Sequence, residues 1–479
     1  MTGEGIDFEN MEFRDSRGNT RIRYLWDQTL LPEQVNSLLP EGYEEFANLA
    51  SPPEGFKTGV EFSQRRINAA LESNMVQRIV PSVDTSGHGT AVAAIAAGGG
   101  QLASGQYQGV APESELLIVK MGNPAPDSFP KTTELMRAIT YAVKKAVELE
   151  RPLAINLSFG NTYGSHDGTS LVERFLDNAA EIGRTVICVG SGNEGAAGGH
   201  GAGSFGKSEG GANVQRIELN VERYQLAFGV QVWKDYSDQI EIELVSPGGR
   251  RIRVSDRESG SRSYVMENTH ILLYVGEPSP YSVKQELYFD FLPAENYVNQ
   301  GVWTFVLIPV RTVTGGYDFY LPSSNVLNAG TRFFTPVPEK TLTIPSTASK
   351  VITVGAYYAA LDAYADFSGR GYPVQGIVTE RILTRDIKPD LVAPGVGIET
   401  IGPNDSFVRV SGTSFATPFV TGSAALMMEW GIIRGHDLFL YGEKVKAYLR
   451  RGAQEIRGER EINAKVGYGS LCLEKSLPI

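Results

Sequence analysis

A serine between small residues is the strongest chemical feature of the sequence. Ser414 lies in the run 411–418, SGTSFATP, which opens a small and apolar pattern that predicts a helix. Pro418 suits the first turn of such a helix, where a missing N–H costs nothing. Ser414 would then face backbone N–H groups that lack acceptors, as a nucleophile beside an oxyanion site requires. Alone, Ser414 could equally be a helix N-cap, and Ala416 excludes the Gly-x-Ser-x-Gly turn of other hydrolases.

A histidine between two glycines could supply the matching base. His88 lies in the run 87–90, GHGT, which leads into an alanine-rich stretch over 91–97 that predicts a helix. Glycine on both sides lets a substrate and a nucleophile approach the imidazole. A lone histidine is more often structural, so His88 predicts general-base catalysis only together with a nucleophile.

An asparagine after an apolar segment could bind a developing negative charge. Asn193 lies in the run 191–195, SGNEG, which directly follows the predicted strand 185–189. Because glycines hold it at the end of a strand, its amide could donate to an oxyanion. By itself the run is also an ordinary turn, so its chemistry depends on Ser414 and His88.

The sequence has two parts with different patterns, and together they must position these residues. From about 59 to 195, and again after 341, short apolar runs alternate with helical patterns. This predicts an α/β fold with a parallel sheet covered by helices on both faces. From 204 to 340, short alternating runs separated by turns predict an all-β sandwich. We therefore expect a catalytic domain in two parts, 1–203 and 341–479, interrupted by an inserted β domain, 204–340.

The composition argues against several classes of protein. The chain has 479 residues and a net charge of −11, which argues against a nucleic-acid or anionic-membrane binder. No window approaches the roughly 18 apolar residues of a membrane span. Residues 1–23 show no basic start followed by an apolar stretch, so we expect no secretory signal. Two cysteines, Cys188 and Cys472, exclude a disulfide framework, and the apolar run around Cys188 predicts a buried free thiol.

Together the three motifs, in the order His, Asn, Ser, resemble the subtilisin-like serine proteases, or subtilases. The likeness covers about 340 residues on both sides of the β insert, and it includes GVAP at 109–112, INLSFG at 155–160, DFSGRG at 366–371 and KPDLVAPG at 388–395. A second set of runs resembles the Csp-type clostridial germination proteases, which carry a jelly-roll insert at this place. These runs are RDSRGN at 14–19, RIRYLWDQ at 21–28, YGSHDG at 163–168 and VGYG at 466–469.

The resemblance implies a mechanism and a set of site residues. Ser414 would attack the scissile carbonyl of a polypeptide substrate, His88 would carry the proton, and Asn193 with the Ser414 N–H would hold the oxyanion. The primary specificity pocket would be flanked by Ser158, Phe159, Gly160, Val189, Gly190, Ser191 and Gly192. No cofactor is implied; subtilases often bind structural calcium, but the sequence locates no metal site. The family is often exported or spore-associated, and the oligomeric state and compartment of this chain stay open.

The triad acid departs from the family pattern. Subtilases carry an Asp at the end of the first core strand, and the run GIDFENMEF at 5–13 matches the segment that follows it. Counting back from Asp7 puts Gly3 in the Asp position; alternatively Met1 replaces the Asp, or the segment is deleted. We therefore expect an incomplete first core strand and a missing acid, which costs roughly 10⁴ in rate. Asp7 and Asp84 are weaker candidates for a substitute, and Asp84 better suits a cleft or a cap.

Three functions are compatible with these features. The first is a subtilase-type enzyme whose chain is incomplete at its N-terminus. The second is a pseudoprotease that keeps the cleft for binding or regulation. The third is a binding protein that uses the β insert, for which we favour a packing role because it shows no ligand motif. The presence of His88, Asn193 and Ser414 together favours descent from an active enzyme.

Overall fold

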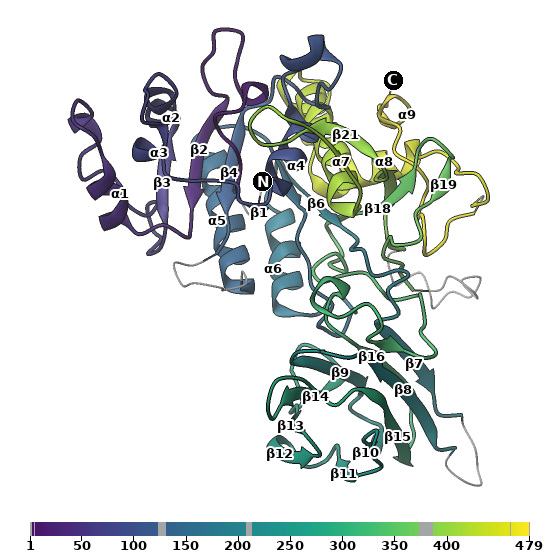
Figure 1. The fold of residues 1–479 in the computed structure, drawn as a ribbon. Coiled ribbons are helices and arrows are strands. Elements are labelled where there is room, and N and C mark those ends of the chain that lie inside the picture. Colours follow the sequence, from purple (N-terminus) through teal and green to yellow (C-terminus); the bar gives the residue numbers. More distant parts are fainter. Residues whose placement is uncertain are drawn as a thin grey trace.

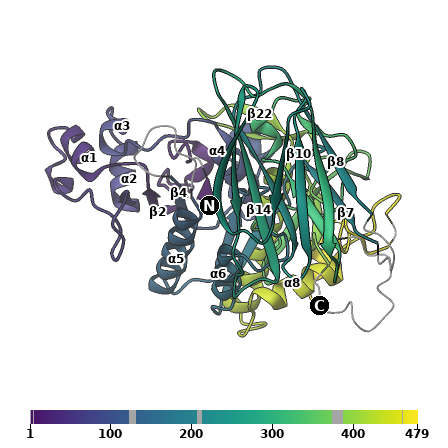
Figure 2. The same ribbon diagram turned by 90° about the horizontal axis from the view of Figure 1, so that it is seen from below.

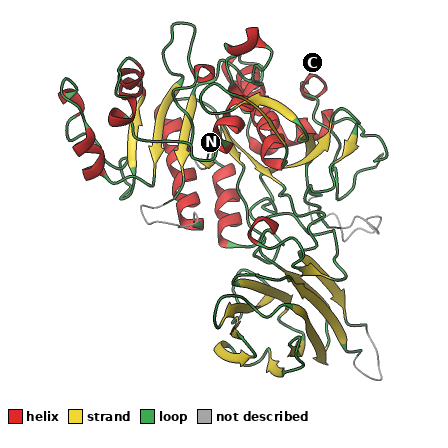
Figure 3. Cartoon of the chain, in the orientation of Figure 1, coloured by secondary structure: helices red, strands yellow, loops and turns green. Residues whose placement is uncertain are grey.

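The structure is a computed structural model that describes residues 2–3, 5–122, 131–206, 213–372, 387–459 and 461–478. A layered body of strands and helices forms the upper part, and an all-β body lies below it (Figure 1). Helices gather in the upper body, whereas the lower one consists mainly of strands and their connecting loops (Figure 3). Along the described ranges, no helix combines the length and the apolar character needed to cross a lipid bilayer.

The upper body is built on one large sheet, which has nine strands within the described residues. Its order is β19 (Ala363–Tyr364), β18 (Ile352–Tyr358), β6 (Thr185–Gly190), β5 (Leu153–Leu157), β1 (Thr2–Gly3), β4 (Leu116–Lys120), β2 (Ile22–Asp27) and β3 (Val60–Ser63), and β20 (Leu391–Pro394) also pairs with β18. Neighbouring strands run parallel except at the two edges, β2 with β3 and β18 with β19. The α/β class predicted from the alternating texture is confirmed.

Helices cover both faces of this sheet, as expected for parallel strands. On β6, Val186 and Cys188 pack against α7 (Thr413–Met428) and α8 (Gly442–Gly452). The alternate residues Ile187 and Val189 pack against α5 (Thr132–Glu148) and α6 (Leu171–Ala180). Cys188 is a buried free thiol as predicted, and burial raises its pKa to about 12.

The remaining helices are short. Helix α4 (His88–Ala97) packs against α7 on the same face of the sheet. The others are α1 (Pro32–Leu38), α2 (Gln64–Leu71), α3 (Val76–Ile79) and α9 (Leu473–Ser476). A hairpin of β21 (Ile398–Ile401) and β22 (Phe407–Val410) lies close to α4.

Strand β1 occupies the middle of the sheet although its described part is only two residues long. Thr2 pairs with Val119 of β4 and Leu157 of β5, and Gly3 pairs with Lys120. Met1 and Glu4, which enter the alternative alignments of the missing acid, lie outside the described residues. Strand β1 thus lies between β5 and β4, and an incomplete first core strand stays a prediction.

The lower body consists of two antiparallel sheets (Figure 2). One has the order β11 (Arg251–Ser255), β10 (Gln239–Val245), β15 (Gly301–Arg311), β8 (Gln215–Val221) and β17 (Arg332–Phe333). The other has the order β12 (Gly260–Met266), β13 (Thr269–Val275), β14 (Lys284–Pro293), β9 (Phe228–Asp235), β16 (Gly316–Tyr320) and β7 (His200–Ser204). Inward residues of both sheets share one core, in which Phe291 lies edge-on to Trp303 at 5.0 Å. A jelly-roll connection of these strands and independent domains divided at 204 and 340 stay predictions.

Short polar contacts tie the sandwich to the loops after β5 and β6. The Thr162 hydroxyl donates to the Leu321 carbonyl at 2.6 Å, and the Gly164 N–H donates to Gln231 Oε1 at 2.7 Å. After β6, the buried carboxylate of Glu194 accepts from the N–H of Ser324 at 3.1 Å. Burial raises the pKa of Glu194 despite this bond. Two loops, one after β5 and one after β6, therefore hold the joint between the sandwich and the upper body.

A stack of three rings fills the same joint. Tyr320 on β16 lies between His166, at a centroid distance of 4.0 Å, and His200, at 4.6 Å. His166 is bonded through Nε2 to the Thr162 carbonyl at 2.8 Å, and burial lowers its pKa to about 4. His200 pairs through Nε2 with Asp318 at 3.2 Å. The joint thus contains a histidine that is held neutral.

We expect this joint to weaken in mild acid. Unfolded His166 takes up a proton as the pH falls below about 6.5, whereas the folded residue stays neutral to a pKa of about 4. Stability is therefore lost between these two values, by about 3 kcal/mol in total. His166→Phe, which keeps a ring beside Tyr320, should show a smaller fall in melting temperature between pH 7 and pH 5 than the unmodified chain. His270→Gln, at an exposed histidine, is the control, and equal falls in all three proteins would contradict the prediction.

Candidate active site

Ser414 lies in the first turn of α7, at the opening of a buried helix. The helix begins at Thr413 after Gly412, whose φ of +146° a residue with a side chain rarely adopts. The early N–H groups of a helix lack acceptors within it, and its dipole adds positive potential at this end. The half-buried Ser414 therefore lies where a negative charge can be stabilised.

The position predicted for Pro418 is wrong. Because α7 begins at Thr413, Pro418 lies in the second turn, not the first, and it leaves the carbonyl of Ser414 without its usual helical donor. The hydroxyl of Ser158 donates to that carbonyl at 2.8 Å. Ser158 in turn accepts from Asn156 Nδ2 at 2.9 Å. Ser158, predicted as a flank of the pocket, thus also fixes the backbone of Ser414.

Asn193 is joined to the residue before Ser414. Its Oδ1 accepts from the N–H of Thr413 at 3.0 Å and from the Thr413 hydroxyl at 3.2 Å. The N–H of Gly192, which has a φ of +91°, donates to the same hydroxyl at 3.1 Å. Because both bonds from Thr413 go to Oδ1, the Nδ2 of the exposed Asn193 is left to donate elsewhere.

His88 opens α4, which packs against α7. Its half-buried ring lies edge-on to Phe415, the residue after Ser414, with ring centroids 5.3 Å apart. Gly87 before it is left-handed, with a φ of +76°. A side chain on Gly89 would lie 1.9 Å from the Gly5 carbonyl, so the glycines bring this turn against the N-terminal segment. His88 thus contacts the residue after Ser414, and Asn193 contacts the residue before it.

The two candidate substitute acids are committed to other partners. Asp84 accepts from the N–H groups of Gly87 and Thr90, both at 2.9 Å, and from the Thr90 hydroxyl at 2.6 Å. It therefore caps the start of α4, as its position suggested. Asp7 accepts from the N–H of Asn404 at 2.7 Å, and burial raises its pKa. Gly3, the first candidate for the family's acid position, pairs with Lys120 at the end of β4.

The predicted pocket residues flank one further side chain that sequence reasoning did not identify. Phe159 and Gly160 follow β5, Val189 and Gly190 end β6, and Ser191 and Gly192 follow it. Thr343 lies between the two groups: a Cβ on Gly160 would be 2.5 Å from its hydroxyl, and one on Gly192 would be 2.4 Å from its methyl. The N–H of Thr343 also donates to the Ser191 carbonyl at 3.0 Å. Its signal in the sequence is weak, because it stands 150 residues after Asn193 in an unremarkable run, TLTIP at 341–345.

Possible metal ligands do not cluster in the part of the chain that the structure describes. Across the described ranges, no group of three or more His, Cys, Asp or Glu side chains is placed to hold a metal ion. The expectation of no cofactor stays a prediction, and structural calcium, which subtilases often bind, is assigned no site here.

Comparison with known proteins shows which family has a sequence and a fold like those of this chain. A model of the subtilase family matches residues 37–270 and 325–469. The solved structure of the CspB protease of Clostridium perfringens is similar, with a TM-score of 0.84 and 33% identity over 99% of this chain and 91% of that one. Serine protease AprX of Bacillus subtilis is 31% identical over 154 residues, which are 28% of this chain and 31% of AprX. Pyrolysin of Pyrococcus furiosus is 31% identical over 163 residues, 28% of this chain and 11% of pyrolysin. The match thus spans less than a third of these two curated relatives, whereas the family model matches well over half of the chain, and the chain belongs to the subtilase family.

Proposed function

We propose that this protein is a serine endopeptidase in which Ser414 is the nucleophile, His88 the base and Asn193 an oxyanion donor. The observation that carries the proposal is the orientation of the Asn193 amide. Thr413 holds its Oδ1, which leaves Nδ2 and the N–H of Ser414 as the two donors of the proposed oxyanion site. Two donors, one from the loop after β6 and one from the start of α7, suit a charge that develops only in the transition state.

The steps follow from these three side chains. Ser414 Oγ attacks the carbonyl carbon of the scissile peptide bond while His88 accepts the hydroxyl proton. The carbonyl oxygen gains a negative charge, to which Asn193 Nδ2 and the Ser414 N–H donate. When the C–N bond breaks, the proton passes from His88 to the leaving amine. Water then hydrolyses the acyl-enzyme by the same route and frees Ser414.

The substrate that suits the pocket is a polypeptide with a small side chain before the cleaved bond. Gly160 and Gly192 leave space for a side chain, but Thr343 occupies the region between them. Burying a large substrate side chain would require Thr343 to move, and its N–H is held by the Ser191 carbonyl at 3.0 Å. A pocket closed by a threonine therefore favours substrates with Gly, Ala or Ser immediately before the cleaved bond.

One observation favours a second candidate, a catalytically impaired pseudoprotease that binds or regulates. Gly3 has no carboxylate, and Asp7 and Asp84 have other partners. The triad acid of the family orients the tautomer of the histidine and stabilises its protonated form. We therefore propose weak turnover for this chain, with the nucleophile and oxyanion donors in place.

A serine-directed fluorophosphonate probe tests whether Ser414 is a working nucleophile. We expect slow, covalent labelling of the unmodified chain at Ser414, because the probe requires a nucleophile and an oxyanion site but no peptide leaving group. Ser414→Ala should abolish the label. Ser411→Ala, which changes an exposed serine three residues away, should keep it. Labelling that survives Ser414→Ala, or no labelling at all in a folded protein, would exclude the enzyme.

A further inference from the structure

Asp290 is a half-buried carboxylate that has no partner among the described residues. Burial raises the pKa of five carboxyl groups in the described ranges, those of Asp7, Glu173, Glu194, Glu286 and Asp290. The other four accept hydrogen bonds, which lower the pKa again. At Asp290 neither a donor nor a cation from the described part of the chain offsets the burial. An unpaired polar group of this kind is costly, and it points to a ligand.

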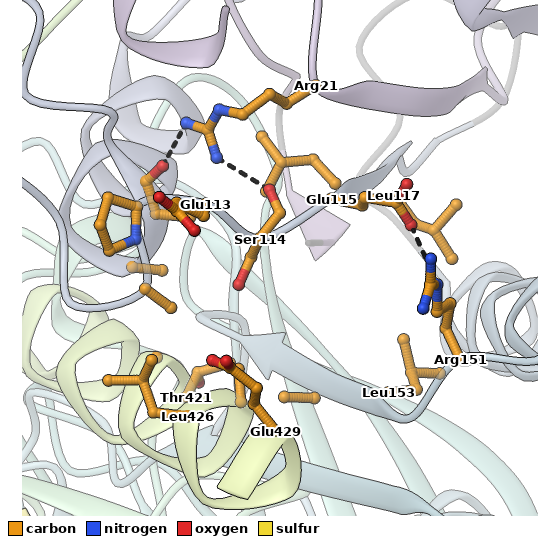
Figure 4. A pocket seen from close by; sticks show the side chains of 18 of the residues that line it. Arg21, Glu113, Ser114, Glu115, Leu117, Arg151, Leu153, Thr421, Leu426 and Glu429 are labelled. Carbon is orange, nitrogen blue, oxygen red and sulfur yellow. Dashed lines mark hydrogen bonds and ion pairs between the residues drawn. The ribbon is translucent and has the colours of Figure 1, made fainter. Parts of the chain in front are cut away.

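Charged side chains of the upper body show the usual arrangement. Figure 4 shows Glu115 paired with Arg151 at 3.6 Å, and Arg21 donating to the Ser114 carbonyl at 2.8 Å. Both arginines line a pocket, and both have partners there. Asp290 therefore departs from a pairing that holds even beside an open pocket.

The strand register places Asp290 on the outer face of the six-stranded sheet of the sandwich. On β14 it alternates with Phe289 and Phe291, whose side chains lie in the sandwich core. Its neighbours across the sheet are Leu272 on β13 and Gly229 on β9. Because Gly229 has no side chain, the space beside the carboxylate on that strand is open to side chains from other positions.

Two tyrosine rings meet over Gly229. A Cβ on Gly229 would lie 2.1 Å from the Tyr288 hydroxyl, so the Tyr288 ring leans over this glycine. Tyr163, from the loop after β5, donates to the Gly229 carbonyl at 3.2 Å and lies edge-on to Tyr288, with ring centroids 5.8 Å apart. Burial raises the pKa of both hydroxyls, and the charge of Asp290 raises each further. The negative charge of Asp290 therefore reaches both rings.

The sheet beside these rings is open to solvent. Tyr274, opposite Tyr288 on β13, is 43% exposed, and Leu272, opposite Asp290, is 42% exposed. Aromatic faces attract cations, and a carboxylate beside them adds charge to that attraction. A flat apolar face that ends at an unpaired carboxylate suits an extended chain that brings one cation.

We propose that Asp290, Tyr163 and Tyr288 form a binding site for a basic side chain of a polypeptide, with arginine preferred to lysine. The guanidinium pairs with a carboxylate through two parallel bonds and places its face on an aromatic ring, which an ammonium group does not do. The net charge of −11 attracts basic polypeptides to the protein. A neutral glycan also stacks on tyrosine rings, but it brings no charge to offset Asp290.

The site deepens the proposed function, on which the identity of the polypeptide as a substrate rests. Tyr163 stands three residues after Gly160, so at most about 11 Å of backbone separates the site from the wall of the candidate pocket. Three or four residues of an extended substrate span that distance. The basic side chain would therefore belong to a residue outside the primary pocket, on the same polypeptide.

The test measures peptide binding to the Ser414→Ala chain, so that turnover plays no part. The probes are dodecapeptides of alternating alanine and serine that carry one arginine, one lysine or one citrulline at the centre. Citrulline has nearly the shape of arginine but no charge. We expect the arginine peptide to bind at least roughly tenfold more tightly than the citrulline peptide, with the lysine peptide between them. Dissociation constants are measured by titration calorimetry at low salt.

Two substitutions make the result specific to Asp290. Asp290→Asn should abolish the preference for arginine over citrulline, whereas Glu295→Gln, which removes a charge at an exposed position of the same sandwich, should keep it. Asp290→Asn should also keep or raise the melting temperature at pH 7, because it removes an unpaired half-buried charge. A fall of several degrees would show that Asp290 has a structural partner, and it would overturn the proposal.

Three further outcomes are decisive. Equal binding of the arginine and citrulline peptides would overturn the proposal. So would binding of a neutral oligosaccharide, cellohexaose, that is lost in Asp290→Asn while the arginine preference is absent. Fluorophosphonate labelling of Ser414 in the Asp290→Asn chain should proceed at the unmodified rate. Labelling without arginine preference would thus reject only this site, and arginine preference without labelling would reject only the proposed nucleophile.

Discussion

Gly3→Asp is expected to raise peptide hydrolysis by about 10² to 10⁴-fold over the unmodified chain. Gly3 lies four residues before Asp7 and pairs with Lys120 at the end of β4. Helix α4, which begins at His88, contacts β1. A carboxylate introduced here would orient the imidazole and stabilise it once it is protonated. The change is measured as kcat/KM on a peptide with alanine before the cleaved bond.

Gly3→Asn is the matched control for that experiment. It has nearly the same shape but no negative charge, so it should leave the rate within about tenfold of the unmodified chain. A large gain with both substitutions would indicate that the side chain acts by filling space. No gain with Gly3→Asp, in a protein that still labels at Ser414, would place the acid position elsewhere.

Asn193→Ala is expected to slow fluorophosphonate labelling of Ser414 by about 10² to 10³-fold, the usual cost of removing one oxyanion donor. The adduct has a negatively polarised oxygen at the place where Nδ2 would donate. Part of the loss comes through Thr413, whose N–H would lose its 3.0 Å acceptor at the start of α7. The measurement is the second-order rate constant of labelling at fixed pH.

Two comparison variants separate the donor from its structural contact. Asn193→Asp keeps an acceptor for Thr413 but replaces the donor by a negative charge, so it should label as slowly as Asn193→Ala. Asn213→Ala, at an exposed asparagine in the lower body, should label at the unmodified rate. If Asn193→Asp labelled at the unmodified rate, Asn193 would serve only to hold the helix.

The sequence was sufficient for the residue types of the candidate site and for the fold class. Ser414, His88 and Asn193 stand in short runs next to strong helix or strand patterns, and local pattern places such residues at element ends. The alternating texture of 204–340 likewise predicted strands, because the side-chain period of two is a local property. The α/β texture on both sides came from the same kind of signal.

Such local patterns could not predict contacts between segments that lie far apart in the sequence. Thr343 fills the space between Gly160 and Gly192 although 150 residues separate it from Asn193. The bond from Ser158 to the Ser414 carbonyl joins residues 256 positions apart. The turn containing Pro418 was misplaced because nothing local signals a distant hydroxyl that replaces the missing N–H. Packing decides these features, and a single sequence does not display it.

The bond between Glu194 and Ser324 joins the β sandwich directly to the loop that carries Asn193. Glu194 is joined to Asn193 by one peptide bond, and its carboxylate is held by the sandwich connection at 3.1 Å. A displacement of the sandwich, by a surface or a bound macromolecule, would therefore act on the residue next to Asn193. The same linkage limits grafting, because exchanging the sandwich for another insert also removes the bond from Ser324 to Glu194.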